Sequence, residues 1–295
     1  MKIGVLAAPS SWHFKDLQRS AGTCHEIRSI SFEDLWAAFG AGDTKFRGGS
    51  LDLRTLDRLI VRTMPRGSLQ QIVFRMNLLG RLARAGVRTV NQPRTIEIAV
   101  DKYLSLSMLS AAGISVPPTM VAEGLSAAMQ CFETLGGDVV FKPIFGSMGT
   151  GIQRLTDRTA AAAFFQLQIE QGQVIYLQKF IDHSDWDLRI LIVGDETFAI
   201  KRQRRGHWLT NMAQGAVGTP HCCTSQEIAL VRKSAEVSGC EIAGVDLFYD
   251  RSNNVPMVCD VNAAPGWKAT ADVLKKDIAK SMIDVVVGAG AGAGV

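Results

Sequence analysis

The stretch VVFKPIFGSMGTGI, residues 139–152, places one charged residue, Lys142, at the end of an apolar run and follows it with three glycines. The apolar run predicts a buried β-strand, and the glycines predict a loop without side-chain bulk. Backbone N–H groups of such a loop can approach phosphate oxygens, and a lysine directed at the same place adds a point charge. We interpret the stretch as a flap that closes over a triphosphate; a plain glycine hairpin with a snorkelling lysine is the alternative.

Two familiar phosphate-binding loops do not fit this stretch. A P-loop carries its lysine directly after the glycines, whereas Lys142 lies four residues before Gly146. A dinucleotide fingerprint reads GxGxxG and opens a helix, whereas this loop reads GxxGxG and leads into the apolar segment IQRL. The sequence therefore argues against both classes of site.

Length and composition limit the number of subdomains and the kinds of partner that the chain can have. The chain has 295 residues, so two or three subdomains are expected, and its net charge is +4. This mild excess makes nucleic acid an unlikely partner and favours an anionic small ligand. The six cysteines form no CxxC pair, so we expect free thiols in a reducing, cytoplasmic compartment. We expect no signal peptide and no membrane span, because no apolar run reaches about 18 residues.

The first third of the chain alternates β-branched runs with helical patterns, which predicts a small parallel βαβ sheet of about 90 residues. Its expected strands are KIGVLAA, RLIVRTMP and VRTVN, and its expected helices are FEDLWAAF (32–39) and residues 68–86. Residues 94–113, 125–137 and 157–172 predict three further helical stretches. From residue 174 onward, an antiparallel sheet is expected from VIYLQKFI, DLRILIVG, ETFAIKRQ, AGVDLFYD and VPMVCDVN.

Two acidic residues and an asparagine lie near the end of the chain. Asp260 and Asn262 are two residues apart on one expected strand, so their side chains share a face, and Asp246 joins them if the two strands pair. Hard oxygen ligands of this kind suit Mg²⁺. Two carboxylates about 4 Å apart repel by about 4 kcal/mol at an effective dielectric of 20, which requires either a proton or a metal. The alternative is that these acids cap strands or pair with arginines.

Basic residues lie between these two regions. Asp187 and Arg189 share one face of an expected strand, away from the apolar face that carries Leu188. The segment KRQRR (201–205) follows, and one of its two faces is expected to line a ligand cleft. Arginine suits charge that spreads over phosphate oxygens during transfer.

Taken together, these segments resemble the ATP-grasp superfamily and, more narrowly, its RimK-like glutamate ligases. The resemblance covers residues 95–268 and rests on the order and spacing of VDKYLSLSMLSAAGISVP, VVFKPIFGSMGTGI, LQKFI, DLRILIVGDE, NMAQGA, GVDLF and DVNAAPG. It implies an α+β, ATP-grasp fold. Residues 1–94 would form an N-terminal βαβ (pre-ATP-grasp) domain, 95–181 a central lid subdomain, 182–288 a C-terminal antiparallel-sheet subdomain with the Mg²⁺ site, and 289–295 a flexible tail.

The resemblance also implies roles for individual residues. The nucleotide would be bound by Lys102, Lys142, Gly146, Ser147, Gly149, Gly151, Gln178, Lys179, Phe180, Ile181, Asp187 and Asn211. The segment 178–181 would form the adenine hinge. Mg²⁺, or Mn²⁺ in its place, would be held by Asp246, Asp260 and Asn262. Arg189 and Arg202 would face the reacting phosphoryl and acyl groups.

The sequence departs from the family pattern at two places. Asp260 stands where the family usually has Glu. Leu209 and Gln214 replace basic residues found in ligases that act on ribosomal protein tails, which argues for another acceptor. Trp208 and Trp267 are candidates for a flat apolar acceptor surface, with core packing as the alternative. The whole chain looks most like the branch tied to tetrahydromethanopterin glutamylation.

The resemblance implies an ATP-dependent, ADP-forming ligase that adds L-glutamate to a carboxylate acceptor, such as a pterin cofactor, through an acyl phosphate. A dipeptide or glutathione-type ligase and an inactive nucleotide-binding regulatory protein are the alternatives. The expected partners are small-molecule substrates and further copies of the chain in a homo-oligomer. Replacing Lys142 or Asp246 by alanine is expected to abolish ADP release and to leave the fold intact.

Overall fold

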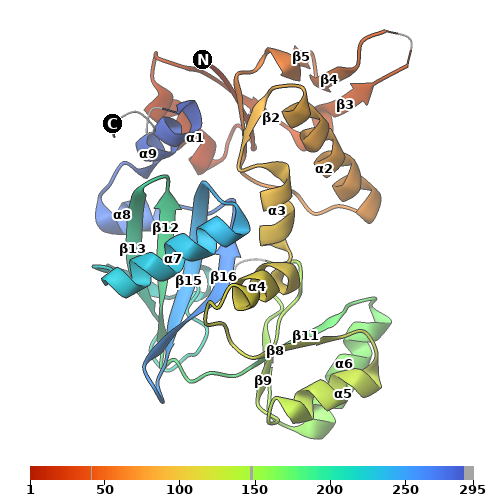
Figure 1. The fold of residues 1–295 in the computed structure, drawn as a ribbon, viewed down its shortest axis with the longest axis vertical. Helices are drawn as coiled ribbons and strands as arrows, with labels where there is room; N and C mark the ends of the chain where they lie inside the picture. The colour runs from red at the N-terminus through yellow and green to blue at the C-terminus, as the bar shows by residue number, and fades with distance from the viewer. Residues whose placement is uncertain (41, 147–148, 289–295) are drawn as a thin grey trace.

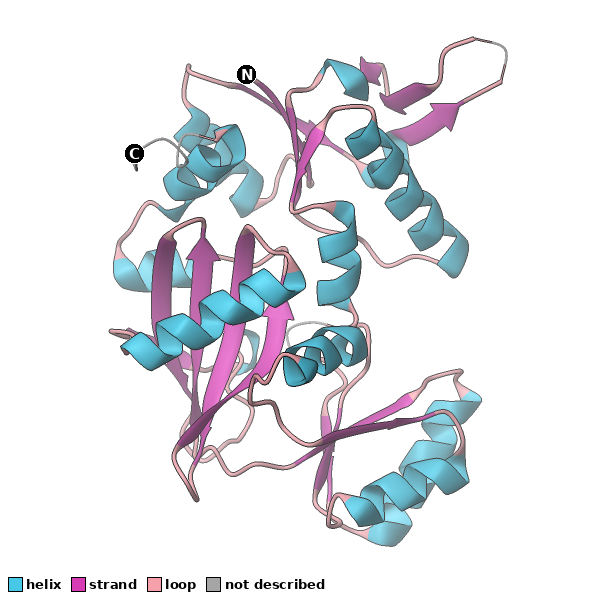
Figure 2. Ribbon diagram, in the orientation of Figure 1, coloured by secondary structure: helices cyan, strands magenta, loops and turns pink. Residues whose placement is uncertain are grey.

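The computed structural model describes residues 1–40, 42–146 and 149–288, which combine helices with four β-sheets (Figures 1 and 2). Figure 1 shows the N-terminal strands at the top, the sheet that contains β12 (Trp186–Val193) below them at left, and the sheet that contains β11 (Ile175–Lys179) at lower right. One sheet is parallel and the other three are antiparallel. This mixture confirms the predicted α+β class.

The N-terminal sheet is parallel, as predicted. Its strands lie in the order β2 (Glu26–Ile30), β1 (Lys2–Leu6), β6 (Arg58–Val61) and β7 (Arg88–Val90). Helices α1 (Trp12–Ala21) and α2 (Leu69–Arg84) connect these strands. The apolar side chains of β1 and β6 are buried on both faces of the sheet, which is typical of parallel strands covered on both sides.

Two elements of this region differ from the prediction. The segment FEDLWAAF is not a helix: a 3₁₀ turn (Phe32–Asp34) leads into β3 (Leu35–Ala38), which pairs with β4 (Lys45–Gly48), and β4 pairs with β5 (Leu51–Asp52). Strand pairing overrides local helix propensity here, and the Trp36 indole N–H donates to the Gly49 carbonyl. A second 3₁₀ turn, Leu53–Thr55, precedes β6.

The second difference concerns residues 94–113, which form two helices, α3 (Pro93–Val100) and α4 (Lys102–Ala111). Asp101 separates them in an extended conformation, and its side chain accepts a hydrogen bond of 3.0 Å from the Leu104 N–H. An aspartate that caps the second helix in this way cannot continue the first. The break places Lys102 at the first residue of α4.

The small sheet, here called the central sheet, has the strand order β10 (Gln153–Leu155), β9 (Val139–Phe141), β11 (Ile175–Lys179) and β8 (Thr119–Ala122). Helices α5 (Leu125–Thr134) and α6 (Arg158–Glu170) lie side by side on one face (Figure 1). Their apolar residues build one core with the sheet, centred on Phe165 and Ile175. Strand β8 was not predicted from the sequence.

The five-stranded sheet, here called the large sheet, has the order β14 (Val217–Pro220), β13 (Glu196–Gln203), β12 (Trp186–Val193), β15 (Ile242–Asp250) and β16 (Val255–Asn262). The predicted hairpin at Gly194 and the antiparallel pairing of the last four predicted strands are present, but the predicted strand at 174–181 is β11 of the central sheet and not part of the large sheet. Helix α7 (Ser225–Ser238) covers one face (Figure 2), where Leu188 and Ile190 are fully buried. A 3₁₀ turn (Met212–Gln214) precedes β14. Strand β14 was not predicted from the sequence.

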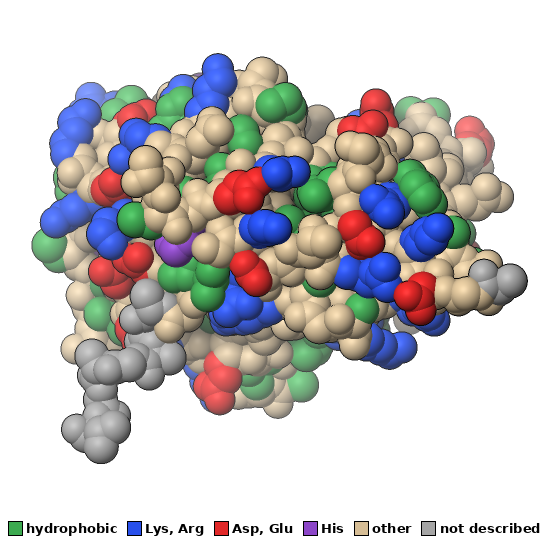
Figure 3. Space-filling view, turned by 90° about the horizontal axis from the view of Figure 1, so that it is seen from above, with side chains coloured by type: hydrophobic (Ala, Val, Ile, Leu, Met, Phe, Trp, Pro, Cys, Tyr) green, Lys and Arg blue, Asp and Glu red, His purple; other side chains and the backbone are tan. Residues whose placement is uncertain are grey.

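The chain ends with α8 (Lys268–Leu274) and α9 (Ile278–Val287), and α9 packs beside α1 (Figure 1). One core therefore joins β1 and α1 to α9 and to Leu191 and Val193 of β12. The predicted tail, 289–295, lies outside the described residues. The described helices include none long and apolar enough for a membrane span. Basic and acidic side chains are interspersed on the face seen in Figure 3.

Candidate active site

The register of the large sheet gathers the charged residues on the face opposite α7. Arg189 of β12 lies opposite Asp246 of β15, and Asp246 lies opposite Asp260 of β16. Residues directly opposite each other in an antiparallel pair point to the same face. A β-bulge at Cys259 shifts the register just beyond this pair. The large sheet therefore presents a row of three charged residues on this face, one each from β12, β15 and β16.

Asp246 is held by two arginines. Its Oδ1 accepts from Arg189 Nη1 at 2.8 Å and lies 3.1 Å from Arg202 Nη2. Burial acts to raise the pKa of Asp246, but the charges of Arg189 and Arg202 outweigh burial and hold it below its usual value. The expectation that only a proton or a metal relieves the repulsion between Asp246 and Asp260 is therefore wrong, because the two guanidinium groups already neutralise Asp246.

Arg202 is fixed by a second carboxylate, from Asp187. The Arg202 guanidinium donates to both Asp187 oxygens at 2.6 Å, and the Thr210 hydroxyl donates to Oδ2 at 2.7 Å. Asp187 is buried, which raises its pKa against the opposing charge of Arg202. Both oxygens of Asp187 are engaged inside the protein, so Asp187 orients Arg202. This position differs from the expectation that Asp187 contacts the nucleotide. Thr210 was not found from the sequence.

Asp260 differs from Asp246 in having no counter-ion at contact distance. Among the described residues it makes no hydrogen bond or ion pair, and burial raises its pKa while the charges of Lys102 and Lys142 oppose that rise. Asn262 lies two residues on, and its Oδ1 accepts from the Ala264 N–H at 2.8 Å. A half-buried carboxylate without a partner, beside a second carboxylate and an amide oxygen, is a donor set that fits Mg²⁺.

Two lysines act on the Asp260 carboxylate, Lys102 from α4, which packs against β16, and Lys142 from the end of a central-sheet strand. Lys102 Nζ donates to the carbonyls of Gly146 at 2.7 Å and Ile144 at 3.3 Å, so it anchors the start of the glycine loop. Burial lowers the pKa of Lys102, and the charges of Asp260 and Lys142 act on it in opposite directions. Lys142 follows β9 directly. Both lysines are thus close enough to Asp260 to affect its titration, although more than a hundred residues separate them in the chain.

In the glycine loop, Gly149 lies close to Asn211 and Gln214, in the segment that leads into β14. Gly149 has a φ of +73°, and a Cβ there would lie 2.7 Å from Asn211 Oδ1. Gly151 has a φ of +76°, and its Cβ would lie 3.0 Å from the Pro143 ring. These two positions require glycine both for the backbone conformation and for the close approach. Ser147, which the sequence also placed in the loop, lies outside the described residues.

The predicted adenine hinge, residues 178–181, is largely satisfied within the protein. The N–H of Lys179 donates to Pro118 and the N–H of Phe180 to Asp138, both at 2.9 Å. Gln178 is buried, and its Nε2 donates to Thr119 and Tyr176. The N–H groups of Lys179 and Phe180 are therefore engaged inside the protein, which leaves the carbonyl groups of this segment and Ile181 for contact with an adenine.

The two tryptophans differ in position. Trp267 is 1% exposed, and its Nε1 donates to Asp16 Oδ2 at 2.8 Å, so it belongs to the core and offers no acceptor surface. Trp208 is half-buried and meets the edge of Phe180 with ring centroids 6.0 Å apart. The sequence also missed Arg62, at the end of β6, which lies over the Trp267 ring at 5.4 Å. Its only signal was an arginine directly after an apolar strand.

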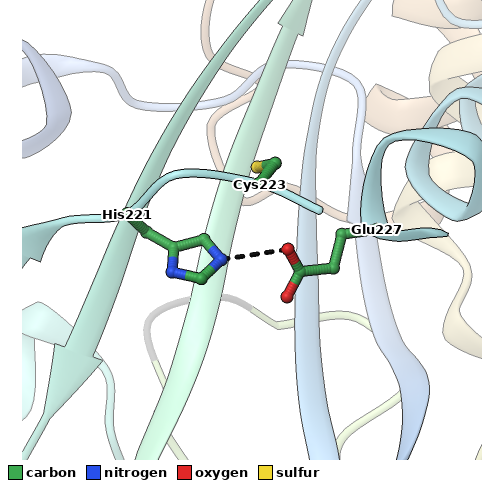
Figure 4. Close-up of side chains that lie close together, drawn as sticks. All are labelled: His221, Cys223 and Glu227. Carbon is green, nitrogen blue, oxygen red and sulfur yellow. Dashed lines mark hydrogen bonds and ion pairs between the residues drawn. The ribbon is translucent and has the colours of Figure 1, made fainter. Parts of the chain in front are cut away.

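A separate cluster lies at the start of α7, where His221, Cys223 and Glu227 place their ligand atoms within 4.8 Å of one another (Figure 4). Glu227 accepts from the Thr224 N–H at 2.7 Å and the Tyr249 hydroxyl at 2.7 Å, and its Oε2 lies 3.0 Å from His221 Nε2. Thr224 and Glu227 form a capping box. These three contacts account for a buried carboxylate as a structural anchor of α7.

Replacing Glu227 with alanine is expected to lower the free energy of unfolding by about 1–3 kcal/mol, because buried donors lose their acceptor. Burial opposes ionisation of Glu227, but its hydrogen bonds to His221, Thr224 and Tyr249 prevail and lower its pKa. The loss is therefore present above the usual glutamate pKa and shrinks as the pH falls below it. Urea denaturation at pH 7 and pH 4 measures this, with exposed Glu236→Gln on the same helix as control; equal stability of Glu227→Ala and wild type at pH 7 would contradict the assignment.

Comparisons with known proteins identify the family of the chain. The model of the RimK-like ATP-grasp domain matches residues 99–286. A tetrahydromethanopterin:alpha-L-glutamate ligase of Methanosarcina acetivorans is 29% identical over 69% of this chain and 67% of its own length. A probable alpha-L-glutamate ligase of Legionella pneumophila (strain Corby) is 28% identical over 97% of this chain and 95% of its own.

The fold also matches a solved structure. The ATP-grasp ligase PsnB, solved with a phosphomimetic variant of its minimal precursor, Mg and ADP, superposes with a TM-score of 0.72 at 15% identity over 97% of both chains. The family model matches most of the chain, and this match leads to one conclusion. The chain belongs to the RimK-like ATP-grasp family and is an ATP-dependent ligase.

Proposed function

We propose that the protein joins L-glutamate to a carboxylate acceptor at the expense of ATP, through an acyl phosphate. The observation that carries the proposal is that Lys102, at the start of α4, holds the carbonyls of the glycine loop, and that the charges of Lys102 and of Lys142, which follows β9, both act on Asp260 of the large sheet. Two cationic side chains facing a carboxylate without a partner suit a metal–nucleotide complex better than either component alone. The names of the relatives in Methanosarcina and Legionella support glutamate as the added amino acid.

In this proposal Asp246, Asp260 and Asn262 would hold Mg²⁺, with Mn²⁺ as a substitute, and the ion would neutralise charge on the ATP phosphates. Lys102 and Lys142 would bind the phosphates, covered by the glycine loop. Residues 178–181 would lie against the adenine. We also propose that the chain divides functionally at residues 94 and 181, so that the nucleotide lies between the second and third parts.

The arginines would act on the reacting groups. Arg189 and Arg202 are locked by the carboxylates of Asp246 and Asp187, so their guanidinium groups need no reorganisation when charge develops on the transferred phosphoryl group. The acceptor carboxylate would attack the γ-phosphate and form an acyl phosphate and ADP. The glutamate amine would then attack the acyl carbon and release phosphate as the amide forms. A closed loop would protect the acyl phosphate from water.

The acceptor is the open part of the reaction. Leu209 and Gln214, near the glycine loop, are uncharged and do not favour an acidic peptide tail. We propose a small carboxylate such as a pterin cofactor. An ADP-release screen that combines L-glutamate and other amino acids with candidate carboxylates, followed by mass spectrometry of the product, tests this. A product that contains a different amino acid would replace glutamate, and no ADP release with any pair would overturn the proposal.

Replacing Lys142 with alanine is expected to weaken ATP binding about 10- to 100-fold and to abolish ADP release, because one charge-assisted contact to the phosphates is lost. The side chain makes no hydrogen bond with the described residues, so the thermal unfolding temperature should stay near that of wild type. Isothermal titration with a non-hydrolysable ATP analogue measures binding, with exposed Lys45→Ala on β4 as control. Near-normal turnover of Lys142→Ala would refute the assigned role.

A further inference from the structure

Arg62 is a half-buried arginine that makes no ion pair with the residues that the structure describes. Its Nη1 donates to the Ala264 carbonyl, whereas its Nε is sealed from solvent and has no hydrogen-bond partner among the described residues. Burial, aided by the charge of Arg189, lowers the pKa of Arg62 to about 10. A desolvated guanidinium with one neutral acceptor is costly to the fold. Such a group is best explained by an anion that it binds during function.

His13, in the first turn of α1, lies beside Arg62 and is also incompletely satisfied. Its ring meets Trp267 edge-on with centroids 4.5 Å apart, and its Nε2 is buried without a partner in the described part of the chain. Burial lowers the pKa of His13 to about 4, so the ring is neutral at pH 7 and can donate one hydrogen bond. The nearby Asp16 is occupied by Arg19 and Trp267.

Gly266 leaves space between these two side chains. A Cβ built on Gly266 would lie 3.6 Å from both Arg62 Nη2 and His13 Nε2, the two nearest heavy atoms. Gly266 is exposed, whereas His13 Nε2 beside it is sealed from solvent, so a ligand reaches this nitrogen only when the neighbouring side chains shift. We call Arg62, His13 and Gly266 the Arg62 pocket. It has two convergent donors, a net positive charge and an opening that a side chain at position 266 would fill.

The Arg62 pocket is joined to the proposed reaction centre by a short segment. Asn262 Oδ1 accepts from the Ala264 N–H, and the Ala264 carbonyl accepts from Arg62. On the other side, Arg189 passes over Gly244, where a Cβ would lie 2.5 Å from Arg189 Nη2 and 2.8 Å from Pro265 Cβ. Arg189 thus lies against the same Pro265–Gly266 turn that borders the pocket. A ligand in the pocket is therefore next to the group proposed to face the acyl phosphate.

We propose that Arg62 and His13 bind a carboxylate of one of the two substrates, over Gly266, and thereby position that substrate for the reaction. The proposal rests on the ligase function above, whose substrates both carry carboxylates. Arg62 Nη2 and His13 Nε2 face the same point over Gly266, so the two side chains together can donate to the two oxygens of one carboxylate. The N-terminal parallel sheet then contributes directly to substrate binding, through the carboxyl end of β6 and the first turn of α1.

The test is isothermal titration of wild type and Arg62→Gln, both saturated with Mg²⁺ and a non-hydrolysable ATP analogue. The probes are L-glutamate, which carries the attacking amine, and N-acetyl-L-glutamate, in which that amine is blocked. We expect Arg62→Gln to bind at least one probe about 10- to 100-fold more weakly, with unchanged affinity for the ATP analogue. A loss confined to L-glutamate assigns the pocket to the incoming amino acid; a loss confined to the blocked acid assigns it to the acceptor.

Two further variants serve as a control and as an independent test. Arg84→Gln removes an equivalent charge from the exposed end of α2 and should bind both probes as wild type does. Gly266→Val leaves Arg62 in place but fills the pocket, and it should weaken the same probe as Arg62→Gln even if the latter folds poorly. Wild-type affinity in Arg62→Gln and Gly266→Val, or binding of neither probe by wild type that does bind the ATP analogue, overturns this inference. Failure of wild type to bind the ATP analogue would instead count against the ligase proposal.

Discussion

Replacing Asp260 with asparagine is expected to reduce Mg²⁺-dependent ADP release by at least about a hundredfold, because a charged metal ligand is lost from the proposed site. The same variant should be as stable as wild type, or more stable, in the absence of Mg²⁺. Burial raises the pKa of Asp260 in the folded state. The folded state therefore holds the proton more tightly than the unfolded state, so the carboxylate destabilises the fold as the pH rises above the usual aspartate pKa.

Thermal unfolding with and without MgCl₂ and ATP measures both parts of this prediction. Wild type should gain stability on addition of the metal–nucleotide, whereas Asp260→Asn should gain much less. Asp272→Asn, at an exposed position on α8, makes the same chemical change away from the site and should behave as wild type. If Asp260→Asn retained the full Mg²⁺-dependent gain, Asp260 would not be a metal ligand.

Replacing Asp246 with alanine should have the opposite effect on stability, with a loss of about 3–5 kcal/mol in the free energy of unfolding. The carboxylate is 7% exposed and is shared by Arg189 and Arg202, which the variant would leave buried with less compensation. The expectation from sequence that this variant keeps its fold intact is therefore replaced by a strong destabilisation. Loss of ADP release in this variant would report on the fold as well as on the metal.

The pH dependence of this loss follows from the titration of Asp246. Its pKa in the folded state lies below the usual value because Arg189 and Arg202 overcome the effect of burial. Its contribution to stability is therefore present above the aspartate pKa of the unfolded chain, about 3.9, and is lost as the pH falls through the lower folded value. Urea denaturation at pH 7 and pH 3 measures the difference, with Asp260→Ala as the matched control. A loss at pH 7 no greater than that of the control would show that the arginines do not depend on Asp246.

Much of the fold follows from local pattern in the sequence. The alternation of strands and helices predicted the parallel N-terminal sheet, and the period of two along DVN placed Asp260 and Asn262 on one face. Local signals failed where distant pairing decided the outcome. Residues 32–39 have a helical pattern, yet the β3–β4 pairing turns part of them into a strand. The predicted helix 94–113 breaks at Asp101 because the side chain caps α4.

For the site, too, part of the chemistry follows from the sequence and part only from the tertiary structure. The sequence by itself determined the kinds of group present: a lysine before a bare glycine loop, and oxygen ligands at strand spacing. Only the tertiary structure decided which charges meet, because register and sheet packing join residues far apart in the chain. It paired Asp246 with Arg189 and Arg202, left Asp260 without a counter-ion in the described part of the chain, buried Trp267 and placed Arg62 beside His13. Periodicity reports which way a side chain faces, whereas the free energy of a buried charge depends on neighbours that periodicity does not specify.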